Sequence, residues 1–159
     1  MSGDGSVRRI LSQGGSRLLS GVAPVFAGSD FGFVNLESPL TTGGGQQTGQ
    51  GLVLNGDPRL ATAMAAADIN VVTLANNNAG DQGDAGLLET LDTLDRAGVA
   101  AVGAGRGLVA SRRAAVLGRG DTRTAFLGFS DVLPEGYVAT PASPGVSPGR
   151  IDLAGVRDA

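Results

Sequence analysis

The sequence predicts an α/β protein, because segments of strand character alternate with segments of helix character along much of the chain. The run INVVTLA at 69–75 is rich in β-branched residues and bounded by polar ones, which is typical of a strand buried on both faces. The segment GLLETLDTLDRAG at 86–98 carries leucines at helical spacing. The run VAAVGAG at 99–105 then predicts a short strand that leads into a glycine turn. Strand, helix and strand in this order favour a sheet with helical connections.

Composition bounds the kind of protein. The chain has 159 residues, of which 42% are hydrophobic and 27 are glycine. This length supports one domain that buries roughly 70% of its unfolded surface, and we expect residues 1–159 to form a single, partial domain. The net charge is −3 and all 12 basic residues are arginine. A mildly acidic chain lacks the positive field of a nucleic-acid-binding protein, so no nucleic-acid partner is expected.

Two residue types are absent from the sequence. Without cysteine, the chain cannot form a disulfide, a thiolate metal site or a cysteine nucleophile. Without histidine, it lacks the usual general base near pH 7 and the commonest ligand of transition metals. Any metal would be held by carboxylate, amide, carbonyl and water oxygens, which suit Mg²⁺, Ca²⁺ or Mn²⁺ better than Zn²⁺.

No apolar run approaches the roughly 20 residues that cross a bilayer. The start, MSGDGSVRRILSQGG, also lacks the apolar core of a signal peptide. The sequence as given therefore predicts a cytoplasmic chain with no membrane segment.

The first third of the chain predicts four elements in order. Residues 6–19 show weak helical spacing, which Gly14 and its neighbour loosen. FGFVNLE at 31–37 is typical of a buried strand that ends in polar residues. TTGGGQQTGQG at 41–51 predicts a loop without a packing signal, and LVLN at 52–55 predicts a short strand.

Two helices are predicted with their ends. For the first, Asp57 is the expected N-cap and Pro58 occupies the first turn. Apolar residues recur on one of its faces: Leu60, Ala63, Met64 and Ala67. The second helix has a stripe of Leu87, Leu91 and Leu94, widened by Leu88, and Gly98 supplies its C-terminal stop.

The last part of the chain contains fewer regular signals. RAAVLGRGDTRTAFLGFS at 113–130 predicts two strands around a Gly-Asp turn. From Pro134 the sequence is punctuated by proline and glycine, so we expect 134–159 to be a loop-rich, loosely packed tail. The ending carries no closing element, which favours the first portion of a longer fold. Such a portion would expose an apolar face and unpaired sheet edges, so self-association is expected.

Oxygen-bearing side chains gather after the predicted strands. Asn35 and Glu37 end the strand at 31–37, and Asp4 lies in the N-terminal SGDGS. The run TLANNNAGDQGDAG follows the strand at 69–75, and its candidate ligands are Asn76, Asn77, Asn78 and Asp81. Ligands bind beyond the carboxyl ends of strands in α/β sheets, so these clusters could approach the ligand set of a divalent cation. The alternative is a plain turn, because Asn, Asp and Gly tolerate left-handed backbone and form local hydrogen bonds.

Four stretches carry a resemblance to a known family. They are NLESPLTT at 35–42, LANNNAGDQGDAGLLETLDTLDRAGV at 74–99, GAG at 103–105 and ATPASPGV at 139–146. Together they resemble the CapA family of poly-γ-glutamate capsule synthesis proteins, a branch of the calcineurin-like metallophosphoesterases. The spacing agrees across most of the chain, and SGDGS falls where the family places its first Gly-Asp.

The resemblance implies a fold and a site. The fold would be a two-sheet α/β sandwich of metallophosphoesterase type with flanking helices, present here in incomplete form. Asp4, Glu37 and Asn77 resemble the ligands of a divalent metal such as Mn²⁺ or Mg²⁺, while Asp81 and Gly83 resemble the residues that shape the next turn. Asn35 and Asn76 would complete the binding surface. A capsule polymer or a phosphate-containing ligand would be the partner, because the two-metal site that the resemblance implies would bind phosphate oxygens and activate water. Members of the family are linked to polymer synthesis, export or anchoring at the cell surface.

Two departures from the family pattern bear on activity. The family motif reads Ala-Asn-Asn-His, whereas Asn78 stands at the histidine position here. Asparagine cannot take up or release a proton near pH 7, and loss of a general acid or base lowers rates by about 10²- to 10⁴-fold. The family also continues into later segments whose histidines complete the metal site. These departures favour a chain that is inactive by itself. The alternatives are a non-catalytic binding or assembly module and an unrelated α/β domain with asparagine-rich turns.

Three weaker signals have simple structural interpretations. GAGRG at 103–107 suggests a phosphate loop, but it lacks the third glycine of a dinucleotide fingerprint and favours a strand-end turn. Glu89, Asp92 and Asp95 lie away from the leucine stripe, which predicts a solvated helix face. Four arginines could bind an anionic polymer, although surface solubility is the favoured explanation: Arg8, Arg9, Arg112 and Arg113.

Overall fold

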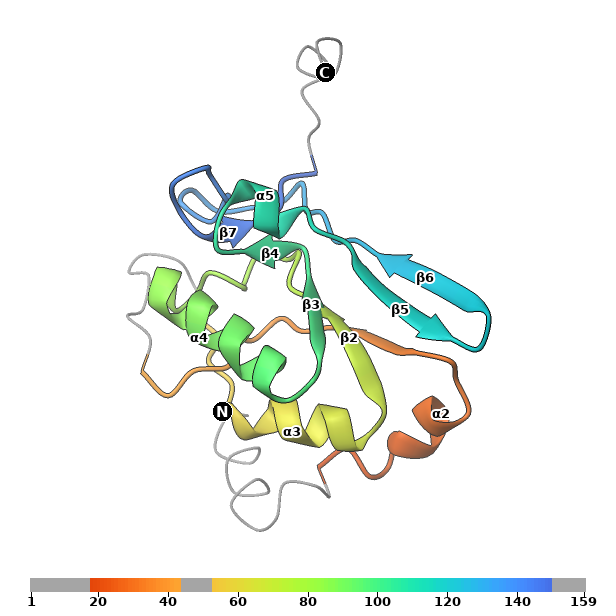
Figure 1. The fold of residues 1–159 in the computed structure, drawn as a ribbon. Helices are drawn as coiled ribbons and strands as arrows, with labels where there is room; N and C mark the ends of the chain where they lie inside the picture. The colour runs from red at the N-terminus through yellow and green to blue at the C-terminus, as the bar shows by residue number, and fades with distance from the viewer. Residues whose placement is uncertain (1–17, 44–52, 150–159) are drawn as a thin grey trace.

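A three-stranded parallel sheet lies at the centre of the fold in the computed structural model, which describes residues 18–43 and 53–149 (Figure 1). Its strands, in spatial order, are β1 (Gly32–Asn35), β2 (Ile69–Thr73) and β3 (Ala100–Val102). The central strand β2 has three of its five residues buried, which explains its β-branched, apolar sequence. The α/β class predicted from the sequence is confirmed.

Two helices connect these strands and build the core. α3 (Arg59–Ala66) lies between β1 and β2 along the chain, and α4 (Gly83–Arg96) lies between β2 and β3. Their apolar faces join the sheet in one cluster of buried side chains, which includes Leu36, Met64, Val72, Leu74, Leu87 and Leu94. Because both connections return the chain to the start of the next parallel strand, the carboxyl ends of β1 and β2 lie at the same edge.

The predicted helix ends lie close to those in the structure, although the N-cap of α3 is Pro58 and not Asp57. The Asp57 carboxylate accepts a hydrogen bond from the backbone N–H of Arg59, at 2.9 Å, and so satisfies a free donor of the first turn. In α4, Asp84 lies in the first turn and Arg96 in the last, where each charge complements the helix dipole. The chain then leaves the helix through Gly98, whose φ is +74°.

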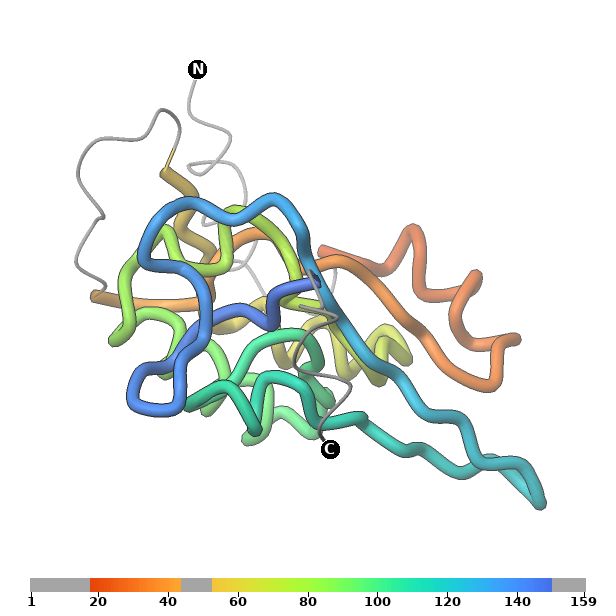
Figure 2. Tube along the Cα trace, turned by 90° about the horizontal axis from the view of Figure 1, so that it is seen from above, coloured from red at the N-terminus to blue at the C-terminus, as the bar shows by residue number. Residues whose placement is uncertain are grey.

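The remaining elements surround this centre (Figure 2). α2 (Ala23–Ala27) precedes β1. After β3, the short strand β4 (Ala104–Gly105) leads to α5 (Leu108–Ser111). β4 pairs in antiparallel fashion with β7 (Gly145–Val146), which brings the C-terminal part of the described chain back to the central sheet.

The two strands predicted at 113–130 form a hairpin. β5 (Ala115–Arg119) and β6 (Thr122–Phe126) are antiparallel and extend away from the body of the molecule (Figures 1 and 2). At the base of the hairpin, the Phe126 ring stacks on that of Phe33 in β1, with centroids 5.6 Å apart. It also meets the Phe31 ring edge-on at 5.7 Å. These aromatic contacts fix the hairpin to the sheet.

Two predicted elements differ from the structure. No strand is present over 53–55, the described part of the run LVLN. Side chains bind this segment instead: the Leu54 N–H donates to Asp81, and its carbonyl accepts from the Gln82 amide. Of the helix expected at 6–19, only Leu18 and Leu19 lie within the described residues, and they form part of a turn.

Residues 134–149 are the described part of the segment for which loose packing is expected. They contain little regular structure, but they bury Tyr137, Ala139 and Val146. Tyr137 accepts and donates backbone hydrogen bonds here, and the N–H of Val146 donates to its carbonyl at 2.7 Å. This part of the chain therefore contributes side chains to the core.

Among the residues that the structure describes, no helix has both the length and the apolar character that crossing a membrane requires.

Candidate functional site

The polar residues predicted to form a site follow the carboxyl ends of β1 and β2. These strands are parallel, and Asn35 at the end of β1 pairs in register with Thr73 at the end of β2. The backbone N–H of Leu36 continues the ladder by donating to the Thr73 carbonyl at 3.0 Å. The loops that carry the two polar clusters therefore begin side by side at one edge of the sheet.

Asn76 joins these two loops. Its side chain is only 8% exposed. The amide nitrogen donates to the Asn35 side-chain oxygen and to the Leu36 carbonyl, both at 3.0 Å. The amide oxygen accepts from the backbone N–H groups of Asn78 and Ala79, at 3.0 and 2.9 Å. Asn76 thus ties the end of β1 to the turn after β2 and closes that turn locally.

The network continues to two exposed side chains. The Asn35 amide donates to a carboxylate oxygen of Glu37 at 3.3 Å. Glu37 and Asn77 are both exposed, and the Asn77 amide nitrogen donates to the Asn78 side-chain oxygen at 3.2 Å. Both residues offer hard oxygen atoms at the solvent side of the cluster.

Asp81 and Gly83 lie further along the turn. Asp81 is 5% exposed, and its two oxygens accept from the Leu54 N–H at 2.7 Å and from the Tyr137 hydroxyl at 3.1 Å. The carboxylate is therefore used in internal hydrogen bonds. Gly83 begins α4 with a φ of +66°, a conformation that favours glycine.

Burial, together with the negative charge of Asp81 and the hydrogen bond to it, raises the pKa of Tyr137 to about 12. The tyrosine therefore remains a hydrogen-bond donor throughout the physiological pH range.

The structure brings some of the predicted site residues together. Asn35, Glu37 and Asn76 belong to one hydrogen-bond network, and Asn77 and Asn78 follow directly in the chain. Asp4 lies outside the described residues. Within the described ranges there is no group of three or more His, Cys, Asp or Glu side chains placed to hold a metal ion. The predicted ligand set of Asp4, Glu37 and Asn77 stays a prediction.

The face of α4 expected to be merely solvated is used more specifically. Glu89 accepts hydrogen bonds from the Thr41 hydroxyl, and from the backbone N–H and the hydroxyl of Thr42, the latter two at 3.1 Å. The Thr41 hydroxyl, followed by the Thr42 backbone, lowers the pKa of Glu89. The neighbouring Thr90 hydroxyl accepts from the Leu40 N–H at 2.8 Å. Two adjacent residues of α4 thus anchor the end of the NLESPLTT motif.

Asp92, on the same helix, forms an ion pair with Arg106. This pair involves the only arginine of the GAGRG run, which the structure places after β4.

Tyr137 is the residue near the site that sequence reasoning missed. Its one signal is that it is the only tyrosine in the chain. Its segment lacks hydrophobic periodicity, so the sequence gives no reason to place it 56 positions away against Asp81.

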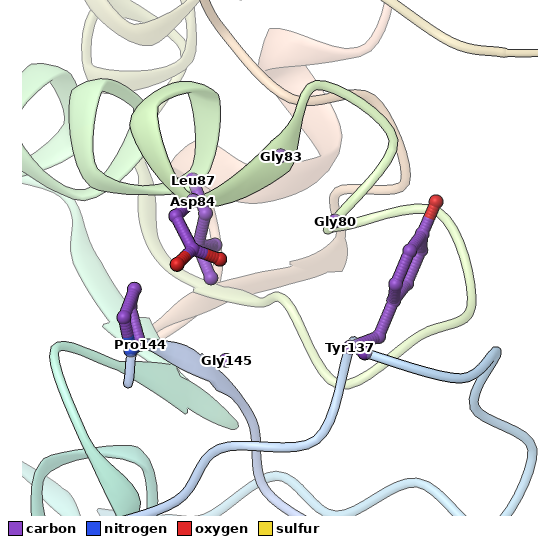
Figure 3. Close-up of a pocket in the computed structure, with 8 residues that line it drawn as sticks. Gly80, Gly83, Asp84, Leu87, Tyr137, Pro144 and Gly145 are labelled. Carbon is purple, nitrogen blue, oxygen red and sulfur yellow. The ribbon is translucent and has the colours of Figure 1, made fainter. Parts of the chain in front are cut away.

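Two hollows lie near these loops. The smaller, about 10 Å³, lies between Tyr137, the start of α4 and Gly145, and has room for about one water molecule (Figure 3). The larger, about 440 Å³, is open and mainly apolar, and it lies between α2, β1 and α3 with Asn35 at its margin. Neither hollow is lined by Glu37 or Asn77, so the side-chain oxygens of these two residues lie at the surface.

The fold and these loops define an α/β protein with oxygen-rich turns at the ends of two parallel strands. The chain belongs to the bacterial capsule synthesis protein PGA_cap family, whose model matches residues 1–154. This confirms the resemblance to capsule synthesis proteins that the motifs predict.

Two curated relatives come from two strains of Mycobacterium tuberculosis, and each is described as a "probable polyglutamine synthesis accessory protein". Each is 33% identical over 134 residues, which cover 79% of this chain and 35% of the relative. The chain thus spans about a third of the length of the curated relatives it matches.

Proposed function

We propose that this chain supplies two loops of a divalent-metal site of the metallophosphoesterase type, which acts in the synthesis of a capsule polymer. The family supports the link to capsule synthesis. The observation that carries the proposal is the Asn76 network, which fixes the loops after β1 and β2 to one another. It leaves the oxygens of Glu37 and Asn77 exposed beside it.

The oxygen ligands offered by this cluster are of the type that a hard cation prefers. Glu37 offers a carboxylate and Asn77 an amide oxygen, and neither oxygen set is fully used by the protein. Mn²⁺ and Mg²⁺ prefer such oxygen ligands, and octahedral geometry calls for about six of them. Asp4 is the further ligand that the family pattern supplies, and water or other protein groups would complete the set.

A bound metal of this kind would polarise phosphate oxygens and lower the pKa of a bound water. The residues of this chain would hold and orient that group. Asn76 would fix the relative position of the two loops, and Asn35 would orient the Glu37 carboxylate through their hydrogen bond. A phosphate-containing ligand or a capsule polymer would then bind at the exposed side of the cluster.

Calorimetry tests the metal site. Titration of the full chain with Mn²⁺ should give saturable binding, and both Glu37→Gln and Asn77→Ala should weaken it by about tenfold or more. The first variant removes the negative charge and one carboxylate oxygen, and the second removes the amide oxygen. Glu135→Gln is the matched control, because Glu135 is an exposed glutamate of the 134–149 segment. Absence of Mn²⁺ and Mg²⁺ binding by the wild-type chain would overturn the proposal.

Asn78 supports a second candidate function, that of a non-catalytic binding or assembly module. Its side-chain amide cannot take up or release a proton near pH 7 at the position where the family has histidine. In the structure it is half-buried and accepts from the Asn77 amide. We infer that the natural chain binds its ligand without hydrolysing it.

Asn78→His discriminates between these functions in an assay with an activated phosphodiester and Mn²⁺. Activity that appears only with histidine would identify a degenerate phosphoesterase. If neither form is active while both bind Mn²⁺, the binding function is favoured. Hydrolysis by the wild-type chain would contradict the non-catalytic assignment.

A further inference from the structure

The turn that carries Asn77 and Asn78 is held at its far end by a segment distant in sequence. The backbone N–H of Asp81 donates to the Asn78 carbonyl at 2.9 Å, so Asp81 closes the turn that begins with the asparagines. The side chain of Asp81 then accepts from Leu54 and from Tyr137. Three separate stretches of chain meet at this one buried carboxylate.

Tyr137 contacts the turn through its ring as well as its hydroxyl. A β-carbon built on Gly80 would lie 2.8 Å from the Tyr137 ring, so the ring packs directly against the backbone of the turn. Figure 3 shows Tyr137 beside Gly80, while Gly83 and the start of α4 lie on the other side of the small hollow. Tyr137 itself is 5% exposed.

The surroundings keep Tyr137 in place. Its N–H donates to the Pro134 carbonyl at 3.2 Å, and its carbonyl accepts from Val146 in β7 at 2.7 Å. β7 in turn pairs with β4, which follows the third strand of the central sheet. The tyrosine is therefore anchored to the sheet independently of the turn that it contacts.

We propose that Tyr137 is a positioning residue of the candidate site: through Asp81 it fixes the 76–83 turn and so sets where Asn77 and Asn78 stand relative to Glu37. Asn76 holds the beginning of this turn and the Tyr137–Asp81 pair holds its end. With both ends fixed, Asn77 and Asn78 have one orientation toward the loop after β1. The functional consequence rests on the proposed metal site, whereas the positioning of the turn does not.

Tyr137→Phe tests the role, because it removes the hydroxyl and keeps the ring against Gly80. In the full chain, amide hydrogen exchange at residues 77–81 should accelerate by about tenfold, as expected for a lost hydrogen bond to a charged group. The side-chain amide signals of Asn77 and Asn78 in a ¹⁵N spectrum should shift. Mn²⁺ affinity should fall by about tenfold, the typical effect of removing an outer support of a metal ligand.

Thr140→Val is the matched control. It also removes a hydroxyl from the same segment, but the partners of the Thr140 hydroxyl lie within its own loop, at Ala142 and Ser143. This variant should lower the melting temperature without changing the asparagine signals or the Mn²⁺ affinity. A purely structural role for Tyr137 would give the same pattern in Tyr137→Phe and would overturn the proposal.

A double-mutant cycle with Asp81→Asn tests whether the pair acts as a unit. Tyr137→Phe should change the exchange at residues 77–81 much less in the Asp81→Asn background than in the wild-type chain. Fully additive effects would contradict the proposed route through Asp81. If the wild-type chain binds no Mn²⁺, the metal site fails, but the exchange and amide signals still decide the positioning role.

Discussion

Asn76 shows how one buried amide can hold two loops. Each of its polar atoms has two partners, and these partners belong to the end of β1 and to the turn after β2. An apolar replacement would leave several of these groups buried without a hydrogen-bond partner. Each such group then loses its hydration with nothing to replace it, which destabilises the folded state.

We therefore expect Asn76→Ala to lower the free energy of unfolding by about 1–3 kcal/mol. Asn77→Ala, next along the chain but exposed, should change it by about 0.5 kcal/mol or less. Urea unfolding followed by circular dichroism measures both. Equal transition midpoints for the two variants would show that the Asn76 contacts contribute little to stability.

The carboxylate of Glu89 stabilises the end of the NLESPLTT loop. Its pKa is lowered in the folded chain, mainly by the Thr41 hydroxyl and the Thr42 backbone. A carboxyl whose pKa is lowered by folding stabilises the folded state above its ordinary pKa. This contribution is lost as the pH falls through the lowered value.

The difference in melting temperature between the wild-type chain and Glu89→Gln should therefore be largest near neutral pH and should shrink below about pH 4. Asp95→Asn is the control, because Asp95 is an exposed carboxylate on the same helix. A Glu89→Gln difference that does not vary with pH would rule out the ionised carboxylate as the stabilising group.

At the scale of elements, the ends of β2 and β3 approach closely at Gly103. Its φ is +82°, and a β-carbon there would lie 2.5 Å from that of Ala75. Gly128 lies over the same place, since its own β-carbon would meet the Thr73 hydroxyl at 2.7 Å. The strand ends that precede the candidate site are thus packed so closely that neither Gly103 nor Gly128 has room for a side chain.

Gly103→Ala should consequently lower the free energy of unfolding by about 1–3 kcal/mol, through backbone strain and the contact with Ala75. Gly118→Ala, in the hairpin, has its nearest contact at 3.9 Å and should be close to neutral. Thermal unfolding of both variants provides the comparison. A Gly103→Ala variant as stable as Gly118→Ala would contradict the close approach of the strand ends.

At the scale of the whole molecule, the hairpin and the sheet leave apolar surface and strand edges available. In the described part of the chain, β1 and β6 each pair on one side only. Leu127 and Phe129, which follow β6, are 52% and 47% exposed. Exposed edges and apolar side chains of this kind promote association between copies.

We expect the sedimentation coefficient of the wild-type chain to rise with concentration over the micromolar range. Leu127→Lys should reduce this rise, because a lysine beside a strand edge disfavours edge pairing. Thr122→Lys, at the other end of β6, adds the same charge away from the apolar residues and serves as the control. A sedimentation coefficient that stays at the monomer value at every concentration would contradict self-association.

Much of the central fold could be predicted from local patterns. The β-branched run at 69–75, the leucine stripe of α4 and the Gly-Asp turn of the hairpin correspond to β2, α4 and the β5–β6 hairpin. These patterns reflect short-range geometry, since the spacing of apolar residues follows the period of the element. The strand expected at 52–55 is absent over 53–55, its described part, because Asp81 and Gln82, distant in sequence, bind the backbone of Leu54.

The candidate site was predictable in its residue types and only partly in its roles. Asparagines and acids after two neighbouring strands indicate a shared edge, and the structure does join Asn35, Glu37 and Asn76 there. The sequence could not distinguish the buried, fully bonded Asn76 from the exposed Asn77, because neighbouring asparagines look alike without a burial pattern.

The sequence by itself determined the α/β class, the family and the oxygen-only chemistry of any metal site. The class and the family follow from the spacing of residues along the chain, and the metal chemistry follows from the absence of histidine and cysteine. Tertiary structure alone decided that Glu89 anchors Thr41 and Thr42, and that Tyr137 reaches Asp81. Those contacts join residues 48 and 56 positions apart. Partners at such separations are chosen by how the elements pack, which no local pattern records.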